Sequence, residues 1–441
     1  MTYDPTQPAY FDAGAAGKDL ARITEICDGC RRCHRLCSTF DFMLDTVDAH
    51  EGDLAKIASG DYRRMVDLCW QCKLCFNHCP YTPPHRWNID FPRLMQRAKA
   101  ARVKAEGIPA HDRALADPDR VGSLGSAFAP LSNWANTFKP HRVLLEAATG
   151  VHRDRTLPKF HRQTFARWFK GRPARPIESA APLGSGGIRP PQTPPATRLT
   201  RPTALFHTCI VNYNEPEVGK DAVAVLEKNG CAVTCPDQVC CGIGYLDAGD
   251  IAGATANARR NITALLPTLV AGGEVVVPQP TCSYVIKKEY PLLVPGEESE
   301  KLAARTFDLF EYLAMRHREG TLSTDFAGPS PGKVAYQVPC HLRAQNMGFK
   351  TRDILQLVPG TKVTLVERCT AMDGTWGMKK EFYPLSLDYA RKAAADMEAA
   401  TPDTWMTDCS LAALQIQDVS GKKPQHPATV LRKAYGLPEE A

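Results

Sequence analysis

Two cysteine motifs near the start of the chain constrain its fold more than any other feature. Each has the spacing Cys-x2-Cys-x2-Cys-x3-Cys, and the second is followed by Pro80. This spacing is typical of paired 4Fe-4S clusters, in which three closely spaced thiolates bind one cluster and the fourth binds the other. The predicted ligand sets are therefore crossed. The first set is Cys27, Cys30, Cys33 and Cys79, and the second is Cys69, Cys72, Cys75 and Cys37.

Structural zinc is the main alternative for these motifs. Zinc usually takes two separated pairs of ligands around one tetrahedral ion, and three closely spaced thiolates suit that arrangement poorly. Disulfides are not expected, because the chain starts with Met-Thr-Tyr-Asp and lacks the basic and apolar segments of a secretory signal. Seventeen cysteines in a reducing compartment indicate metal binding and a cytoplasmic location.

Length and hydropathy limit the remaining choices. The 441 residues, 44% of them hydrophobic, suffice for roughly three domains of ordinary size. The longest apolar stretch, 262–280, is interrupted by Pro267 and by Gly272-Gly273-Glu274, so no segment provides the roughly 20 apolar residues of a membrane-spanning helix. We expect a cytoplasmic protein that could still bind peripherally to the cytoplasmic membrane.

The net charge of +6 is concentrated in one segment. Residues 142–175 contain nine Lys or Arg and only two acidic residues, and aromatic side chains such as Phe165 and Trp168 are interspersed among them. A short helix with this pattern could lay its aromatic side on a membrane or a partner protein. Alternatively, the aromatics pack on their own domain and the basic side is solvated. Nucleic-acid binding is not favoured, because no base-reading module accompanies the basic residues.

Proline and glycine divide the chain into two parts with different patterns. The segment 172–202 is too rich in both to form a helix or a central strand, which indicates a linker. Beyond it, short β-branched runs alternate with helical spacing, as in α/β proteins. Strands are predicted at 204–207, around Val233, and at 274–277, 334–338 and 361–366, with a helix over 219–229 that stops at Gly230.

The second part also contains an internal repeat. In its first copy a strand leads to Cys209, then to Cys240-Cys241-Gly242, then to Cys282; in its second copy a strand leads to Cys340, then to Cys369, then to Cys409. The two copies have closely similar spacings, and a duplicated domain explains this better than chance.

The predicted fold class is therefore α + α/β: an N-terminal helical, two-cluster ferredoxin-like domain, a linker, and two tandem α/β cysteine-rich repeats. The predicted bounds are 1–110 for the ferredoxin-like domain, 111–171 for a basic helical connecting segment, 172–202 for the linker, 203–325 for the first repeat and 326–441 for the second.

With these motifs the chain resembles the cysteine-rich, or CCG, domain family of heterodisulfide reductase, glycolate oxidase iron-sulfur and lactate-utilization subunits. The likeness is strongest to the family members that serve anaerobic glycerol-3-phosphate dehydrogenase, and it covers nearly the whole chain. Besides the cysteine motifs, it rests on the segments 153–159, 165–169, 211–214, 219–221 and 374–381.

The resemblance implies one cysteine, a Cys-Cys-Gly and a Cys-x2-Cys in each repeat. The first repeat keeps Cys209, Cys240, Cys241 and Cys282 but has Gln279 at a ligand position. This implies a third iron-sulfur centre of the family's non-cubane type, with zinc or free thiols as the alternatives.

The second repeat is more degenerate. It keeps Cys340, Cys369 and Cys409, with Thr370 and Ala412 at the missing places. Metal binding there would require His341 or Asp408 to complete the site. Cys231 and Cys235 could replace a missing ligand in the first repeat, but they are more readily explained as buried thiols.

No catalytic residues are predicted on this chain. It has no Gly-x-Gly-x-x-Gly fingerprint, so flavin or nicotinamide chemistry is expected on another polypeptide. The resemblance implies an iron-sulfur protein that transfers electrons between a flavoprotein dehydrogenase and a membrane quinone pool. The alternatives are a heterodisulfide-reductase-like thiol/disulfide oxidoreductase and an accessory redox protein of a rubrerythrin-type oxidative-stress system.

Overall fold

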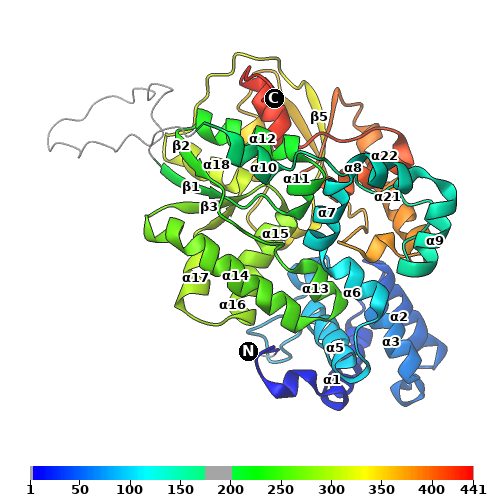
Figure 1. Ribbon diagram of the computed structural model, residues 1–441. Coiled ribbons are helices and arrows are strands. Elements are labelled where there is room, and N and C mark those ends of the chain that lie inside the picture. The colour runs from blue at the N-terminus through cyan, green and yellow to red at the C-terminus, as the bar shows by residue number, and fades with distance from the viewer. Residues whose placement is uncertain (1–2, 174–200, 441) are drawn as a thin grey trace.

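The computed structural model describes residues 3–173 and 201–440. It contains an N-terminal helical region, a group of connecting helices and two small parallel sheets with helices around them (Figure 1). Most of the predicted linker, 174–200, lies outside the described residues. The mixed helical and parallel-sheet composition predicted from the sequence is confirmed.

Helices packed around an apolar core make up the N-terminal region. Asp12 caps the first long helix by accepting a hydrogen bond from the Ala15 amide at 2.8 Å, and Arg31, in the left-handed conformation, ends it. Ile23, Phe40 and Leu94 are almost fully buried between the helices. The helices are η1 (Pro8–Phe11), α1 (Ala13–Cys30), α2 (Ser38–Ala49), η2 (Leu54–Lys56), α3 (Ser59–Leu68), α4 (Leu74–His78) and α5 (Phe91–Glu106).

Five helices connect this region to the sheets. They are α6 (Ala110–Ala116), α7 (Pro118–Ala127), α8 (Ala129–Thr137), α9 (Lys139–Thr149) and α10 (Phe165–Gly171). In α10, Phe165 and Trp168 are buried in the core of the sheet region. The interpretation in which these aromatics face a membrane or a partner is therefore wrong, and the one in which they pack on their own domain is confirmed.

The first sheet has four parallel strands in the order β2-β1-β3-β4. Its strands are β1 (Arg201–Leu205), β2 (Cys231–Thr234), β3 (Glu274–Val277) and β4 (Thr306–Asp308). Around it lie α11 (Cys209–Tyr213), α12 (Pro216–Lys228), α13 (Ile243–Ala248), α14 (Ile251–Val270), α15 (Pro280–Tyr284), η3 (Val285–Glu289), α16 (Tyr290–Leu293), α17 (Glu297–Ala304) and α18 (Leu309–Arg318).

The second sheet has three parallel strands in the order β6-β5-β7. Its strands are β5 (Lys333–Gln337), β6 (Lys362–Val366) and β7 (Thr404–Met406). Its helices are α19 (Cys340–Ala344), α20 (Lys350–Leu355), η4 (Trp376–Met378), α21 (Tyr383–Ala399), α22 (Ser410–Ser420) and α23 (Pro427–Ala434).

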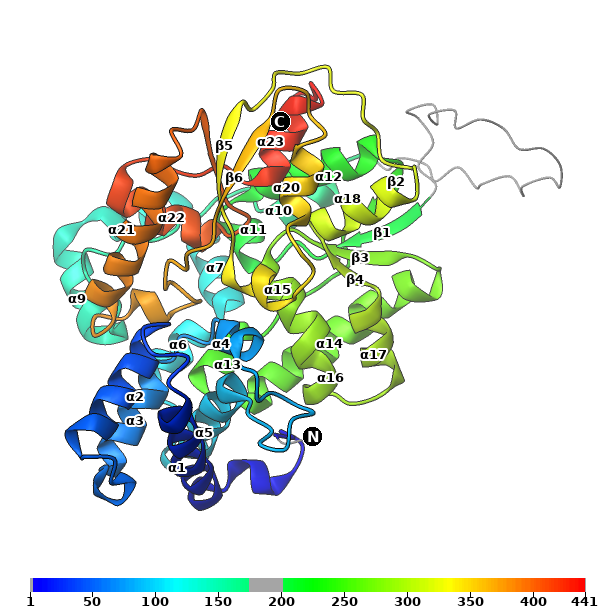
Figure 2. The same ribbon diagram turned by 180° about the vertical axis from the view of Figure 1, so that it is seen from behind.

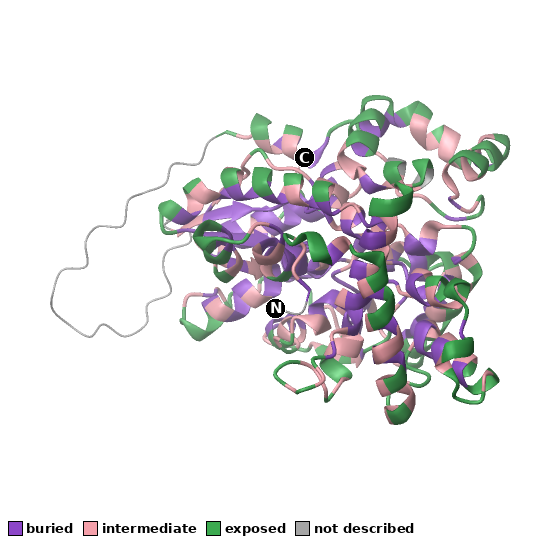
Figure 3. Ribbon diagram, turned by 90° about the horizontal axis from the view of Figure 1, so that it is seen from below, coloured by how far each residue is buried: buried purple, intermediate pink, exposed green. Residues whose placement is uncertain are grey.

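Five of the seven strands lie where the sequence predicts them, and the predicted helix is α12. The sequence missed β4 and β7, because runs of three residues are too short to show a strand pattern. The strands are largely buried beneath their helices (Figure 3).

The two sheets share one apolar core. Leu205 and Val276 of the first sheet belong to the same buried cluster as Tyr336 and Met406 of the second. The N-terminal helices lie below both sheets in Figures 1 and 2. No helix of the described segments has the length and apolar character needed to cross a membrane.

Arg155 links the connecting segment to the second sheet region through hydrogen bonds and an ion pair. Its side chain is fully buried and donates to the Gly377 carbonyl at 2.7 Å and to Ser386 Oγ at 2.6 Å. Nη1 lies 3.5 Å from the Asp418 carboxylate. Burial lowers the pKa of Arg155, although Asp418 opposes this effect. A buried cation with these partners is difficult to replace.

We predict that Arg155→Met lowers the free energy of unfolding by about 3–5 kcal/mol, because Asp418 and the two buried acceptors lose their partner. Denaturant unfolding followed by circular dichroism measures the change. The matched control is Arg153→Met, which removes an exposed arginine paired with Glu146 at the surface. Equal effects of the two substitutions would contradict a special role for the buried arginine.

Candidate metal centres

Cys27, Cys30, Cys33 and Cys79 line one small cavity. The first two are at the end of α1, and the left-handed Arg31 turns the chain so that Cys33 comes back beside them. Burial and the neighbouring thiols raise the pKa of Cys27 to about 12 and that of Cys33 to about 11. Thiols held this close ionise together readily only when a cation compensates their charge.

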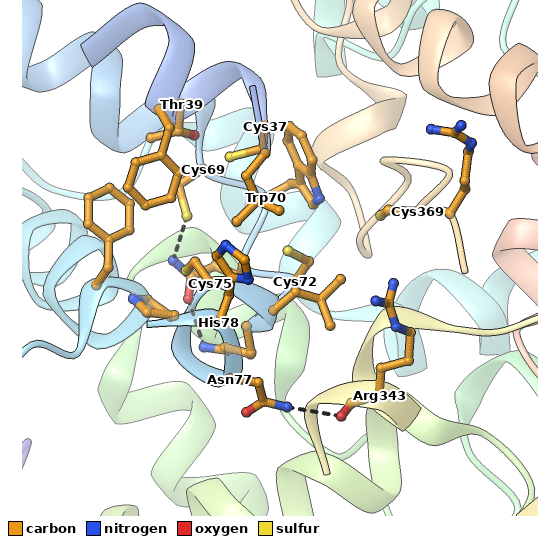
Figure 4. Close-up of a pocket in the computed structure, with 18 of the residues that line it drawn as sticks. Cys37, Thr39, Cys69, Trp70, Cys72, Cys75, Asn77, His78, Arg343 and Cys369 are labelled. Atoms are coloured by element: carbon orange, nitrogen blue, oxygen red, sulfur yellow. Dashed lines mark hydrogen bonds between the residues drawn. The ribbon is translucent and has the colours of Figure 1, made fainter. Parts of the chain in front are cut away.

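Cys37, Cys69, Cys72 and Cys75 line a second, larger cavity of about 1000 Å³ (Figure 4). Cys37 precedes α2, and the other three surround a loop in which Gln71 and Lys73 both have positive φ. This backbone turns sharply enough to direct three sulfurs into one space. Burial raises the pKa of all four thiols.

The two cavities therefore sort the eight N-terminal cysteines into the crossed sets predicted from their spacing. Each cavity combines the first three cysteines of one motif with the last cysteine of the other. That these residues bind clusters remains a prediction.

A third thiol group lies in the first sheet region, and parallel strand topology explains its position. Cys209, Cys240 and Cys282 follow the carboxyl ends of β1, β2 and β3, which meet at one edge of the sheet. The side chain of Cys240 contacts those of Cys209 and Cys241, and Cys241 also contacts Cys282. The four predicted residues of this repeat therefore converge.

The second sheet repeats this layout. Cys340 follows β5, Cys369 follows β6, and Cys409 follows β7. Cys340 and Cys369 are in side-chain contact, and their hydrogen bond lowers the pKa of Cys369 to about 7. Burial raises the pKa of Cys409 to about 12. Three thiols are again brought together at the carboxyl edge of a parallel sheet.

Comparison with known proteins matches the same parts of the chain. The Citrate utilization protein B Fer4-like domain matches residues 16–105, and the Cysteine-rich domain matches twice, at 203–287 and 334–417. Lactate utilization protein A of Bacillus pumilus (strain SAFR-032) is 30% identical over 186 residues, which cover 40% of this chain and 74% of that protein. The chain belongs to the cysteine-rich, or CCG, domain family.

Two further relatives indicate the range of this family, and each is one subunit of a larger enzyme. The relative from anaerobic glycerol-3-phosphate dehydrogenase of Escherichia coli (strain K12) is 29% identical over 350 residues, covering 79% of this chain and 82% of the relative. The relative from fumarate reductase (CoM/CoB) of Methanothermobacter marburgensis is 29% identical over 244 residues, covering 54% of this chain and 45% of the relative.

Both residues suggested as replacement ligands in the second CCG repeat already have hydrogen-bond partners. His341 uses both ring nitrogens, one with Thr281 Oγ1 at 2.9 Å and the other with the Gln71 carbonyl at 3.1 Å. The Asp408 carboxylate accepts hydrogen bonds from Tyr336 and Thr351. Tertiary hydrogen bonds therefore already engage both residues from which the sequence would take a further ligand.

Gln279, at the position of a missing ligand in the first CCG repeat, joins the two repeats. Its amide nitrogen donates to Ser410 Oγ at 2.8 Å, and its oxygen accepts from the Ser410 amide at 3.3 Å.

Cys231 is buried in the shared core, where its thiol contacts Tyr312 Oη. Cys235 lies beside Gln238. Cys231 is thus a buried thiol, as expected, whereas Cys235 is only half-buried.

One relation was missed by sequence reasoning. Cys369 of the second CCG repeat lines the same cavity as the set that contains Cys72 (Figure 4). Burial raises the pKa of Cys72, and the nearby Cys369 thiol adds to this effect. Asn77 donates to the Arg343 carbonyl across this cavity at 3.0 Å. No sequence pattern relates two segments about three hundred residues apart, so only the structure could place these thiols together.

The donor chemistry of these groups suits iron-sulfur clusters. No group of three or more His, Cys, Asp or Glu residues in the described parts is arranged to hold a single metal ion. A cluster does not require that arrangement, because each thiolate binds a different iron atom. The all-cysteine sets are also the ligands that iron-sulfur clusters prefer.

The crossed sets predict a specific pattern of iron loss. The double variant Cys27→Ser with Cys79→Ser should lose one cluster, about four irons per chain, because both residues belong to one set. Cys27→Ser with Cys37→Ser should lose both N-terminal clusters. Iron and acid-labile sulfide, with EPR of the reduced protein, measure this difference. Cys231→Ser is the control and should keep its iron. If each set instead contained the four cysteines of one motif, Cys27→Ser with Cys79→Ser would lose both clusters and Cys27→Ser with Cys37→Ser would lose only one.

Proposed function

We propose that this chain is an iron-sulfur electron-transfer subunit that passes electrons between a flavoprotein dehydrogenase and a membrane quinone pool. The observation that supports this most is the series of thiol groups that runs through the molecule. The two N-terminal cysteine sets adjoin, since Phe40 lines both of their cavities. The second set in turn shares its cavity with Cys369. Adjoining redox sites are what a relay needs.

The proposed cofactors are two 4Fe-4S clusters and a third iron-sulfur centre in the first CCG repeat. Cys27, Cys30, Cys33 and Cys79 would hold the first cluster, and Cys37, Cys69, Cys72 and Cys75 the second. Cys209, Cys240, Cys241 and Cys282 would hold the third centre. When bound, such clusters supply one-electron carriers. The three thiols Cys340, Cys369 and Cys409 form an incomplete set, and a metal there would need a ligand from outside the known family pattern.

The surrounding residues do what an electron-transfer site requires. Lys73 is only 6% exposed and brings positive charge close to the second set, where it lowers the pKa of Cys69 against the effect of burial. Such a charge favours reduction of a neighbouring cluster. Apolar residues such as Phe40 and Ile89 border the first set and exclude water from it.

We also propose the domain bounds 1–110, 111–171, 172–202, 203–325 and 326–441 for this relay. They are supported by the end of α5 at Glu106 and the start of α6 at Ala110, and by the strands that begin each repeat at Arg201 and Lys333. The relatives from anaerobic glycerol-3-phosphate dehydrogenase and fumarate reductase are each one subunit of their enzyme, which supports a partner chain that carries the substrate chemistry.

Anaerobic copurification of the tagged chain from its host tests this function. We expect a flavoprotein dehydrogenase, identified by mass spectrometry and flavin absorbance, whose substrate reduces the iron-sulfur clusters of the complex and then a water-soluble quinone analogue. The control is Cys27→Ser with Cys37→Ser, which should retain the partner but lose quinone reduction. A thiol or rubrerythrin-like partner without flavin would overturn the proposal in favour of the alternatives.

A further inference from the structure

Large apolar side chains are exposed together on three successive helices. Ten large hydrophobic residues are exposed in the described parts of the chain, and eight of them lie between residues 121 and 144. We call them the α7–α9 surface. Its members are Val121, Leu124, Phe128, Leu131, Trp134, Phe138, Val143 and Leu144, with exposed fractions from 44% to 69%. Soluble proteins rarely expose such a concentration of apolar side chains without a function for it.

The orientation of α7 is the reverse of that of an ordinary surface helix. Its buried residues are Gly122, Gly125 and Ser126, while Val121 and Leu124 face outward. The inner side must be small, because a Cβ at Gly122 would lie 2.2 Å from the Tyr213 ring and one at Gly125 would lie 2.7 Å from the Phe160 ring. In water, an amphipathic helix turns its apolar side toward the core. Here that side is directed away from the described core.

Exposed charges in the stretch of chain that carries this surface are almost all positive. Between residues 118 and 170 the exposed acidic side chain is Asp154, and the exposed basic side chains are Arg120, Lys139, Arg153, Lys159, Arg162, Arg167 and Lys170. The segment that carries several of these bases is held against α8. Asn133 exchanges two hydrogen bonds of 2.9 Å with the backbone of Phe160. Exposed bases such as Lys159 and Arg162 are therefore held beside α8.

We propose that the α7–α9 surface docks on an anionic phospholipid membrane, with its three helices lying in the plane of the interface. Short helices with Trp, Phe and Leu on one side and Lys and Arg at the border are typical of proteins that bind membranes without crossing them. Trp134 stacks on Phe138 with ring centroids 4.9 Å apart, and such amphipathic rings favour the level of the headgroups. An acidic protein partner would also match the charge, but the surface offers few hydrogen-bonding side chains to make a protein contact specific.

This surface lies directly against the first CCG repeat. The Asp119 carboxylate of α7 accepts a hydrogen bond from the Cys240 amide at 2.6 Å, and Gly122 packs on Tyr213 at the end of the helix that begins with Cys209. Docking would therefore bring this thiol group close to lipid-soluble electron acceptors. This functional consequence rests on the proposed electron-transfer role, whereas lipid binding itself does not.

Vesicle binding of the purified full-length chain tests the docking surface. Vesicles of equal parts phosphatidylglycerol and phosphatidylcholine should sediment the protein, while pure phosphatidylcholine should do so much less, and added salt should weaken binding. Trp134 is the only tryptophan of the described residues with an exposed side chain. Its fluorescence should shift to the blue on binding and be quenched by brominated lipid.

Matched variants distinguish binding through this surface from non-specific hydrophobic binding. Leu131→Ser with Leu144→Ser should lower the partition coefficient by at least about tenfold, because apolar burial in the interface is lost. Val270→Ser is the control, since Val270 is 73% exposed on α14, outside the surface. Arg120→Gln with Lys139→Gln should abolish the preference for phosphatidylglycerol. Trp134→Phe should remove the fluorescence shift but keep binding.

Two outcomes would overturn the proposal. One is the absence of binding to phosphatidylglycerol vesicles, or binding that the leucine variant leaves unchanged. The other is a leucine variant that releases the copurifying flavoprotein while vesicle binding is unaffected, which would assign the surface to a protein partner. Because vesicle binding needs no partner and no electron transfer, failure here is distinguishable from failure of the proposed function.

Discussion

The arrangement of the thiol groups depends on one buried cluster of charges between the N-terminal region and the first CCG repeat. Glu289 lies in η3, and Arg93 of α5 contacts it at 3.1 Å while Lys73 contacts it at 3.8 Å. Burial alone would raise the pKa of Glu289, but the two cations outweigh burial and lower it. Removing one member of a buried ion pair typically costs about 3–5 kcal/mol, so these groups fix the relative position of the two regions strongly. Lys73 stands between two cysteines, so the same contact positions their loop.

Parallel strand topology is the second constraint. The carboxyl ends of neighbouring parallel strands meet at one edge, and the loops that follow them are free to carry functional side chains. In both CCG repeats the cysteines lie in those loops or in the first turn of the helices that follow them, so thiols far apart in sequence converge at this edge. This explains why two repeats with different numbers of cysteines keep the same layout. The strands set the positions, and the side chain at each position can then vary.

Local patterns could be predicted from the sequence, and contacts between distant segments could not. The N-terminal cysteine sets follow from spacing within short loops, and α12 follows from its periodicity and the glycine after it. By contrast, the hydrogen bonds of His341 to Thr281 and Gln71 join three separate segments, so only the structure could show that this side chain is already engaged in tertiary contacts. The exposure of the α7–α9 surface likewise depends on contacts between distant segments and could not be predicted from the sequence. Leucines at helical spacing look alike in sequence whether they face the core or the outside, and only the small residues packed on Tyr213 and Phe160 decide the direction.

Gln279, at a position where the family pattern has a cysteine, has a structural role that bears on the proposed relay. Gln279 binds Ser410 of the second repeat, so this altered position now stabilises packing between the repeats. The backbone carbonyl of Thr370 accepts a hydrogen bond from Gln415 within the second repeat. Rigid packing here holds Cys369 in the cavity that the second N-terminal cysteine set lines. On the opposite side, α7 holds the first repeat through Asp119 and carries the apolar surface outward. The two repeats have thus diverged in their neighbours. The second adjoins the N-terminal cysteine sets, and the first adjoins the surface proposed to meet the membrane.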